Sequence, residues 1–398
     1  MKAERAVKRI TFDKTEANPS DTLYVTVPKL NANEVLVPSL LSLLFDIDLS
    51  GGHANNFLVR NVTQALVDKL VVYFGGSILQ DTVGYDIYKI FEDLFLSKEK
   101  RENMILEGIQ SENLCKIRSG AKDKKPQESK LKTSWTRYSE KKYRIRLDHE
   151  ILTDHGVFYP QALYNDLKFE VTLAPAAQVV KGSEKTELKY NLTNIQLEYE
   201  MIRRKTLADM ARSVYNTGKE FVYDHVTRDV VDTFKKETAT KLNIKVNAQK
   251  SSLKAILLLF IEPYGEGARD SEKYVFPDLT KVSVTINGSP NMIYNNGIGG
   301  KDMWEEAQRF FVKEEYKTEH MDMTKFYTGD KFGLVIDLRL MADQLMHGNG
   351  KGLVKTTHGV QLEIEREAKG SGDLNCHVFI VSDYQLNIEK SLLESVET

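Results

Sequence analysis

The chain has 398 residues, of which 41% are hydrophobic and 28% charged, the composition of a soluble globular protein long enough for two or more domains. Its formal net charge of −2 argues against a protein whose whole surface binds nucleic acid. No run approaches the ~18 apolar residues of a transmembrane helix, and we expect no secretory signal. Cys115 and Cys376 are the only cysteines, which excludes a disulfide framework and favours a reducing compartment.

Strand patterns dominate the chain. Lys168–Leu173 and Val360–Glu365 alternate polar and apolar residues, which is typical of strands with one buried face, whereas Leu40–Phe45 and Ile256–Ile261 are apolar runs that suit the interior of a sandwich. Turns rich in Gly, Asn, Asp and Pro between short strands predict antiparallel sandwiches or barrels. In chain order, the expected strands are Thr22–Val27, Leu40–Leu49, Lys69–Phe74, Tyr143–Leu147, Leu167–Leu173, Asn194–Met201, Phe221–Val231, Asn243–Val246, Leu253–Ile261, Lys281–Ile286, Phe332–Leu338, Val360–Glu365 and His377–Ile388.

The order of these elements repeats along the chain. The strand and turn at Lys69–Ser77 are echoed 212 residues later at Lys281–Ser289, and the acidic amphipathic helix expected at Gly84–Phe95 is echoed 216 residues later at Gly300–Phe311. Later strands are offset by only 193 residues, because the first unit carries a longer insert at about 97–142. Solenoid repeats have periods of roughly 20–50 residues, so this much longer period predicts two whole domains.

The patterns also set the expected boundaries. Arg203–Arg212 has weak helical periodicity and is expected to form a short helix between the two units. The basic start of the chain is open to two interpretations, a contact arm and an untethered tail. The expected segments are an N-terminal arm at 1–20, a first unit at 21–202 with the insert at about 97–142, a linker at 203–218, a second unit at 219–390 and a C-terminal tail at 391–398.

A strongly basic segment lies within the insert of the first unit. Lys116–Arg146 holds twelve Lys or Arg residues and only three acidic ones, and Trp135 and Tyr138 stand among these charges. This composition favours a solvated loop. The alternative is a contact with nucleic acid or with a partner protein.

The sequence predicts no catalytic residue, no cofactor-binding residue and no metal ligand. No two of the eight histidines lie two, three or four residues apart, which excludes the His-x-His pair and the His-Glu-x-x-His zinc helix. Two Asp-His pairs at 148–149 and 154–155 form a possible metal cluster, but polar turn residues are expected at a strand end. Gly297–Lys301 lacks both ends of a phosphate loop, and Gly348–Gly352 lacks the context of a dinucleotide fingerprint.

Aromatic residues follow helical spacing on the two repeated helices. Such a stripe either binds a ligand or packs the helix onto the side of a sheet, and the spacing favours packing. The residues are Phe91, Phe95, Trp304, Phe310 and Phe311.

The region from Leu36 to Arg118 resembles a known family. It resembles the major capsid proteins of Maverick/Polinton elements and their adintovirus-like relatives, which are similar to the double jelly-roll major capsid proteins of large DNA viruses and to adenovirus hexon. The resemblance extends over nearly the whole chain, although the chain is short, so large outward insertions are expected to be missing. The segments that carry it are Asn61–Lys69, Leu70–Gln80, Tyr85–Phe95, Ser97–Met104, Tyr190–Met201 and Lys301–Phe311.

This resemblance implies a mainly β fold of two tandem eight-stranded antiparallel jelly-roll sandwiches, each with a short helix in an inter-strand connection. It also implies a homotrimer of near-hexagonal outline that tiles an icosahedral shell beside neighbouring capsomers and a single jelly-roll penton or other minor capsid protein. The implied location is the virion, after synthesis in the host cytoplasm and assembly inside the cell. No cofactor and no small-molecule substrate are implied. Basic segments would supply nonspecific contacts with genome or membrane.

Two other functions remain open on the sequence. The first is a tandem β-sandwich module that binds carbohydrate or a receptor. The second is an enzyme, for which a glycoside-active β-sandwich fits best, because any pair of acidic residues can meet in space.

Overall fold

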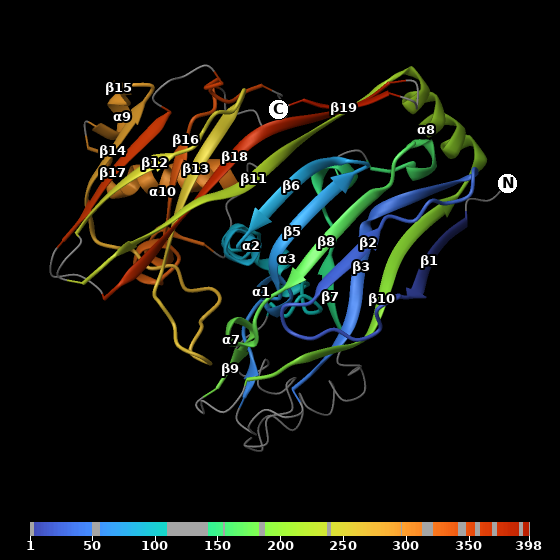
Figure 1. The fold of residues 1–398 in the computed structure, drawn as a ribbon, viewed down its shortest axis with the longest axis horizontal. Coiled ribbons are helices and arrows are strands. Elements are labelled where there is room, and N and C mark those ends of the chain that lie inside the picture. The colour runs from blue at the N-terminus through green and yellow to red at the C-terminus, as the bar shows by residue number, and fades with distance from the viewer. Residues whose placement is uncertain are drawn as a thin grey trace.

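The fold is given by a computed structural model, shown in Figure 1. The structure describes residues 4–49, 56–109, 142–153, 156–182, 188–236, 240–295, 297–312, 321–340, 348–354, 359–367, 372–389 and 393–397. Most of the basic segment at 116–146 lies outside these residues. In the described part of the chain, no helix is long and apolar enough to span a membrane.

The first half of the chain forms two four-stranded antiparallel sheets, together called the first roll. One sheet has the order β1 (Glu4–Thr11), β10 (Asn191–Arg203), β3 (Glu34–Asp48) and β7 (Lys142–Arg146). The other has the order β2 (Thr22–Thr26), β8 (Leu167–Leu173), β5 (Val67–Phe74) and β6 (Ser77–Val83). A separate two-stranded pair joins β4 (Phe57–Leu58) to β9 (Val180–Lys181).

The second half repeats this arrangement as the second roll, which lies beside the first (Figure 1). One sheet has the order β11 (Lys219–Phe234), β18 (Leu374–Glu389), β13 (Leu253–Ile261) and β16 (Gly333–Asp337), and β19 (Leu393–Glu397) pairs with β18. The other has the order β12 (Lys241–Val246), β17 (Val360–Arg366), β14 (Leu279–Ile286) and β15 (Ser289–Pro290).

The two rolls have the same strand order. The short pair β4 and β9 and the added strand β19 are left aside, and the remaining strands of each roll are counted along the chain. In both rolls, one sheet then has the order first, eighth, third, sixth, and the other has the order second, seventh, fourth, fifth. This is the arrangement of a jelly roll. The strands that the sequence paired across the repeat, such as β5 with β14 and β8 with β17, hold equivalent positions. The structure therefore confirms two tandem eight-stranded antiparallel jelly rolls.

Short helices lie in the connections between strands. The two helices expected from the repeat, α2 and α10, hold equivalent places, α2 between β6 and β7 and α10 between β15 and β16, and α8 is the expected helix between the rolls. The helices are α1 (Val62–Ala65), α2 (Tyr85–Asp93), α3 (Lys98–Glu102), α6 (Glu150–Thr153), α7 (Ala176–Val179), α8 (Lys205–Thr217), α9 (Met292–Asn295), α10 (Gly300–Phe311) and α11 (Met323–Thr328), with a 3-10 turn at Pro160–Ala162.

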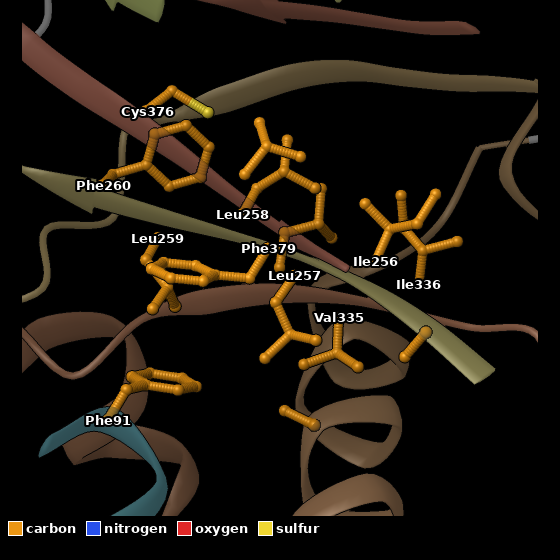
Figure 2. Close-up of a cluster of buried hydrophobic side chains, with 14 of the residues drawn as sticks. Phe91, Ile256, Leu257, Leu258, Leu259, Phe260, Val335, Ile336, Cys376 and Phe379 are labelled. Carbon is orange, nitrogen blue, oxygen red and sulfur yellow. The ribbon is translucent and has the colours of Figure 1, made fainter. Parts of the chain in front are cut away.

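Each roll has its own hydrophobic core between its two sheets. In the second roll, the apolar run of β13 is buried on both faces, which explains why it does not alternate. One face of this sheet meets the sandwich core and the other meets α10 and a helix from the first roll. Figure 2 shows the two sets of side chains, with Ile256, Leu258, Phe260, Ile336 and Cys376 on the first face and Leu257, Leu259, Val335 and Phe379 on the second, toward Phe91.

Both ends of the described chain differ from the sequence-based boundaries. Residues 4–11, expected in an N-terminal arm, form β1 at the edge of a sheet, and residues 393–397, expected in a C-terminal tail, form β19. The sequence did not predict β1, because a strand at the edge of a sheet can be exposed and then needs no apolar residues. Nearly all of its residues are exposed, and Arg5 and Arg9 pair with the buried carboxylates of Glu200 and Glu198 on β10.

Candidate functional site

Polar and aromatic contacts join the two rolls. We call this contact surface the seam. The first roll contributes α2, α3 and the residues just before α1. The second roll contributes the connection at 262–278, between β13 and β14, and the outer face of the sheet that contains β11, β18, β13 and β16.

Helix α2 packs on β5 of the first roll and also contacts the second roll. The Phe91 ring lies 5.1 Å from that of Tyr274, and the Phe95 ring stacks on Phe311 of α10 with centroids 4.8 Å apart. Phe95 also stacks on Trp304, at 6.4 Å. The aromatic stripe therefore packs the repeated helices against each other and onto a sheet, which confirms the interpretation that the spacing favoured.

Two buried ion pairs cross the seam. Arg269 Nη2 lies 2.5 Å from Asp86 Oδ2, and Arg101 Nη2 lies 2.7 Å from Glu272 Oε1. All four side chains are at most 5% exposed. Arg60 Nη2 lies 3.2 Å from the second oxygen of Glu272, so this carboxylate sits between two guanidinium groups.

Glu272 is held in its charged form. Burial alone would raise the pKa of its carboxyl, but the charges of Arg101 and Arg60 outweigh that effect and hold the pKa below its ordinary value. A buried ion pair is costly unless its geometry is good, and removal of one partner leaves an uncompensated buried charge. A placement of the two rolls that separated either pair would leave buried charges without their partners.

Hydrogen bonds to backbone carbonyls reinforce this placement. Tyr274 donates its hydroxyl to the carbonyl of Ile87 at 2.7 Å, and Thr82 of β6 donates to the carbonyl of Val226 on β11 at 2.5 Å. The amide of Gly182 also donates to the carbonyl of Gly267, at 3.0 Å. These contacts join segments that are far apart in the sequence.

The paired strands β11 and β18 belong to both cores. Their antiparallel pairing runs from Lys219 with Ile388 to Phe234 with Leu374. Near Lys219 and Ile388, the side chains of this strand pair pack in the core of the first roll. At the other end of the pair, they pack in the core of the second roll. The residues that these strands contribute to the first core are Phe221, Tyr223, Tyr384, Leu386 and Ile388.

The other candidates from the sequence have structural roles where the structure describes them. Burial lowers the pKa of His149 to about 4, so its ring is neutral, while residues 154–155 lie outside the described part of the chain. Within the described residues, no group of three His, Cys, Asp or Glu side chains is placed to hold a metal ion. At the glycine-rich start of α10, the Asp302 carboxylate accepts a hydrogen bond of 2.9 Å from the backbone amide of Gly299. In a phosphate loop, a phosphate would accept hydrogen bonds from such amides. In the second glycine run, the Gly350 amide donates to Ser252.

The sequence did not reveal the residues of the seam. Arg101 and Glu272 are 171 positions apart, and Asp86 and Arg269 are 183 apart. No local pattern marks such a pair, and in one sequence each residue is indistinguishable from an ordinary surface charge.

Two side-by-side jelly rolls joined in one chain form a double jelly roll, a fold that this chain shares with solved viral major capsid proteins. Among solved structures, the chain is similar to PBCV-1 VP54, fitted into a cryo-EM reconstruction of the virophage Sputnik, with a TM-score of 0.64 and 11% identity over 100% of this chain and 98% of that one. The mavirus major capsid protein has a TM-score of 0.53 and 7% identity, and the match covers 98% of this chain and 90% of that one. The Faustovirus major capsid protein has a TM-score of 0.53 and 8% identity, and the match covers 97% of this chain and 90% of that one. No family model and no curated protein matches the sequence.

The close approach of the rolls at Gly333 gives a first prediction. A Cβ at Gly333 would lie 2.8 Å from Cδ2 of Leu259 and closer still to the Phe91 ring, and both side chains are fully buried. Gly333→Ala is therefore expected to reduce the free energy of unfolding by about 1–3 kcal/mol. Chemical denaturation measures the change. Gly76→Ala is the control, because a Cβ there meets no atom within 4 Å, and an equal loss in both variants would contradict the packing of the seam.

The buried carboxylate gives a second prediction. Glu272→Gln is expected to lower the free energy of unfolding by about 3–5 kcal/mol at pH 7, because it leaves Arg101 buried without its charge partner. The pKa of the Glu272 carboxyl in the folded wild type lies below its ordinary value of 4.5. The charged carboxylate therefore contributes its full stabilisation at pH values above 4.5, and this stabilisation is lost as the pH falls through the pKa of the folded state.

Urea denaturation of both proteins across this pH range tests the expectation, and the two curves should converge in acid. The control is Glu305→Gln, which removes an exposed pair with Lys301 at 3.2 Å and is expected to change stability by at most about 1 kcal/mol. A difference between wild type and Glu272→Gln that is constant with pH would contradict the role of the charge.

Proposed function

We propose that this chain is a viral major capsid protein whose homotrimers form pseudo-hexagonal capsomers of an icosahedral shell. The observation that carries the proposal is the duplication itself, two rolls of the same strand order fixed side by side in one chain. Three such chains around a three-fold axis present six similar wedges, and hexagonal blocks tile a surface without gaps. The similarity in fold to the mavirus and Faustovirus major capsid proteins supports this function.

The proposal extends to origin and partners. The sequence resemblance supports a member of the Maverick/Polinton and adintovirus-like group. Its partners would be two further copies of the chain, neighbouring capsomers and a penton or other minor capsid protein, all within the virion. Such a protein acts through repeated subunit contacts, so this role requires no catalytic residue, cofactor or small-molecule substrate.

A comparison of the two rolls indicates which surface joins the copies. Strand β11 is covered by β6 and α6 of the same chain. The Thr82 hydroxyl on β6 donates a hydrogen bond to the carbonyl of Val226, and the Glu150 carboxylate on α6 accepts one of 2.6 Å from the amide of Asp224. In the part of the chain that the structure describes, its equivalent in the first roll, β1, has no such cover, and Val7 is 52% and Ile10 44% exposed. A long, open edge strand with apolar residues is a site of association.

The covering surface follows from the same equivalence. The counterpart of β6 in the second roll is β15, which is exposed and is followed by α9, where Met292 is 62% exposed. Placing β15 and α9 of one copy on β1 of the next would repeat, between chains, the contact that already exists within the chain. Three such contacts close a ring.

The oligomeric state tests this proposal. Size-exclusion chromatography with light scattering is expected to give three times the chain mass of 45.4 kDa for the wild type. The double variant Val7→Glu, Ile10→Glu should shift the protein to monomer, because it places two carboxylates on the proposed contact. Tyr24→Glu on β2, which also replaces an exposed apolar residue on an edge strand, should remain trimeric. A monomeric wild type that is retained on a carbohydrate column would overturn the capsid function in favour of a binding module.

A further inference from the structure

The chain has eight histidines, and all three that the structure describes lie at or beside the seam. The ring of His149, just before α6, lies 5.0 Å from that of Tyr223 on β11. His225 is on β11 itself, and His377 is on β18 opposite Leu259. Figure 2 shows the Leu259 side chain on the face of the sheet toward the first roll, and residues that are directly opposite in a sheet share a face. The contact between the rolls therefore contains three titratable rings.

Each of these rings has a buried nitrogen without a hydrogen-bond partner. His149 is 9% and His225 7% exposed, and His377 is half-buried. Within the described residues, His149 Nε2, His225 Nδ1 and His377 Nδ1 each have less than 1 Å2 of accessible surface and no partner. A protonated imidazole carries a hydrogen on both nitrogens, so in each charged ring this nitrogen would be a buried donor without an acceptor. In His149, Nδ1 would also turn a hydrogen toward the amide of Ile151, from which it accepts a hydrogen bond of 3.3 Å in the neutral ring.

The charged neighbours of His225 are positive. Its ring stacks on that of Tyr384 with centroids 4.0 Å apart, and Lys250 Nζ donates to the Tyr384 hydroxyl at 3.0 Å. Burial lowers the pKa of His225 to about 3, and the charges of Lys250 and of a protonated His149 act in the same direction. A proton on His225 would therefore place positive charge beside positive charge in a buried position.

The acidic neighbours of His149 do not offset its burial. Burial lowers the pKa of its ring to about 4, although the charges of Glu150 and Asp148 act in the opposite direction. The group that it meets on β11 is the ring of Tyr223, which is uncharged because burial raises the pKa of its hydroxyl. The contact with β11 therefore does not stabilise a charged imidazole.

His377 is influenced by two guanidinium groups. Burial lowers the pKa of His377 to about 4, and the charges of Arg228 and Arg269 add to this effect. Two carboxyls of the first roll act on the same arginines, because Asp86 pairs with Arg269 and Asp68 interacts with the charges of both. These carboxyls reduce the repulsion without reversing the direction of the His377 pKa.

We propose that the seam is an acid-operated latch, in which protonation of His149, His225 and His377 loosens the contact between the two rolls. The pKa values of these rings in the folded protein lie below the ordinary value of 6.5, so the opened or unfolded chain binds the protons more readily. The stability that the neutral rings contribute is complete above pH 6.5 and is lost as the pH falls from 6.5 toward 4. Glu272 stays charged down to about pH 4.5, because its pKa lies below that value, so loss of its ion pairs does not begin the opening.

One carboxyl of α2 acts in the opposite direction. Asp93 accepts a hydrogen bond of 2.9 Å from Asn61, and burial raises its pKa to about 6. The folded protein therefore binds this proton more readily than the unfolded chain, and stability from this group rises as the pH falls through 6. One carboxyl against three imidazoles leaves acid as the condition that opens the latch. In the capsid subunit, which rests on the function proposed above, an acidic surrounding would weaken the shell.

Urea denaturation of the full-length protein at pH 7 and pH 5, at one protein concentration, tests the proposal. The unfolding constant should increase by at least about tenfold for each histidine and decrease about tenfold for Asp93, which gives a net increase of at least about 100-fold. The triple variant His149→Gln, His225→Phe, His377→Gln should lose this increase. His225→Phe keeps an aromatic ring that can stack on Tyr384.

Hydrogen exchange at the same two pH values, corrected for its intrinsic pH dependence, shows where the wild type opens. Helix α2 and the connection at 262–278 should lose protection in acid, whereas β17, in the sheet of the second roll that lies away from the seam, should keep it (Figure 1). An equal loss of protection in all three segments would indicate general acid denaturation and would overturn the latch.

The control variant replaces the other histidines with Gln and should keep the full response to acid. An equal response in wild type and the triple variant, or loss of the response in the control, would contradict the proposal. If the triple variant does not fold at pH 7, the three single variants replace it, and each should remove at least about a tenfold part of the increase. The oligomeric state of the wild type is measured separately at pH 7, so failure here leaves the capsid function untouched. The histidines of the control are His53, His155, His320, His347 and His358.

Discussion

The antiparallel pairing of β11 with β18 is the constraint on which the rest of the structure depends. These two long strands are shared by both cores, so the first roll cannot tilt against the second without breaking backbone hydrogen bonds or exposing apolar side chains. Inter-domain motion is the ordinary expectation for two domains in one chain unless their interface is large and apolar. Here the continuous ribbon removes that freedom, and the angle between the rolls becomes a fixed property of the monomer.

The duplicated helices show how two similar units come to be used differently. Helix α10 packs on β16 of its own roll, whereas α2 packs both on β5 of its own roll and against the neighbouring roll, where Phe91 and Phe95 meet Phe311. Asp86 lies on the same helix and pairs with Arg269, so apolar packing and charge act on one element. The apolar contacts supply most of the favourable free energy, and the buried ions penalise any other docking.

The sequence predicted the fold well and the sites poorly, for physical reasons. Alternating polar and apolar residues and uninterrupted apolar runs both indicate burial, so strands such as β8, β13 and β17 were predicted. The similar strand, turn and helix patterns at a similar distance along the chain revealed the repeat. Strand β1 was not predicted, because most of its residues are exposed and an exposed edge strand has no alternating apolar pattern. Strand β15 was not predicted, because two residues are too few for a pattern to show. The pairing of Glu272 with Arg101 depends on three-dimensional proximity that no local pattern encodes.

The sharing of strands between cores has a consequence for synthesis. The first roll buries Tyr384, Leu386 and Ile388 of β18, which are translated after strands β12 to β17 of the second roll. Domains commonly fold one after another as they leave the ribosome, but the first roll of this protein cannot complete its core until β18 has been made. Until then its apolar surface remains open to other nascent chains on the same message. A chain that stopped before β18 would therefore lack both a finished second roll and a finished first one.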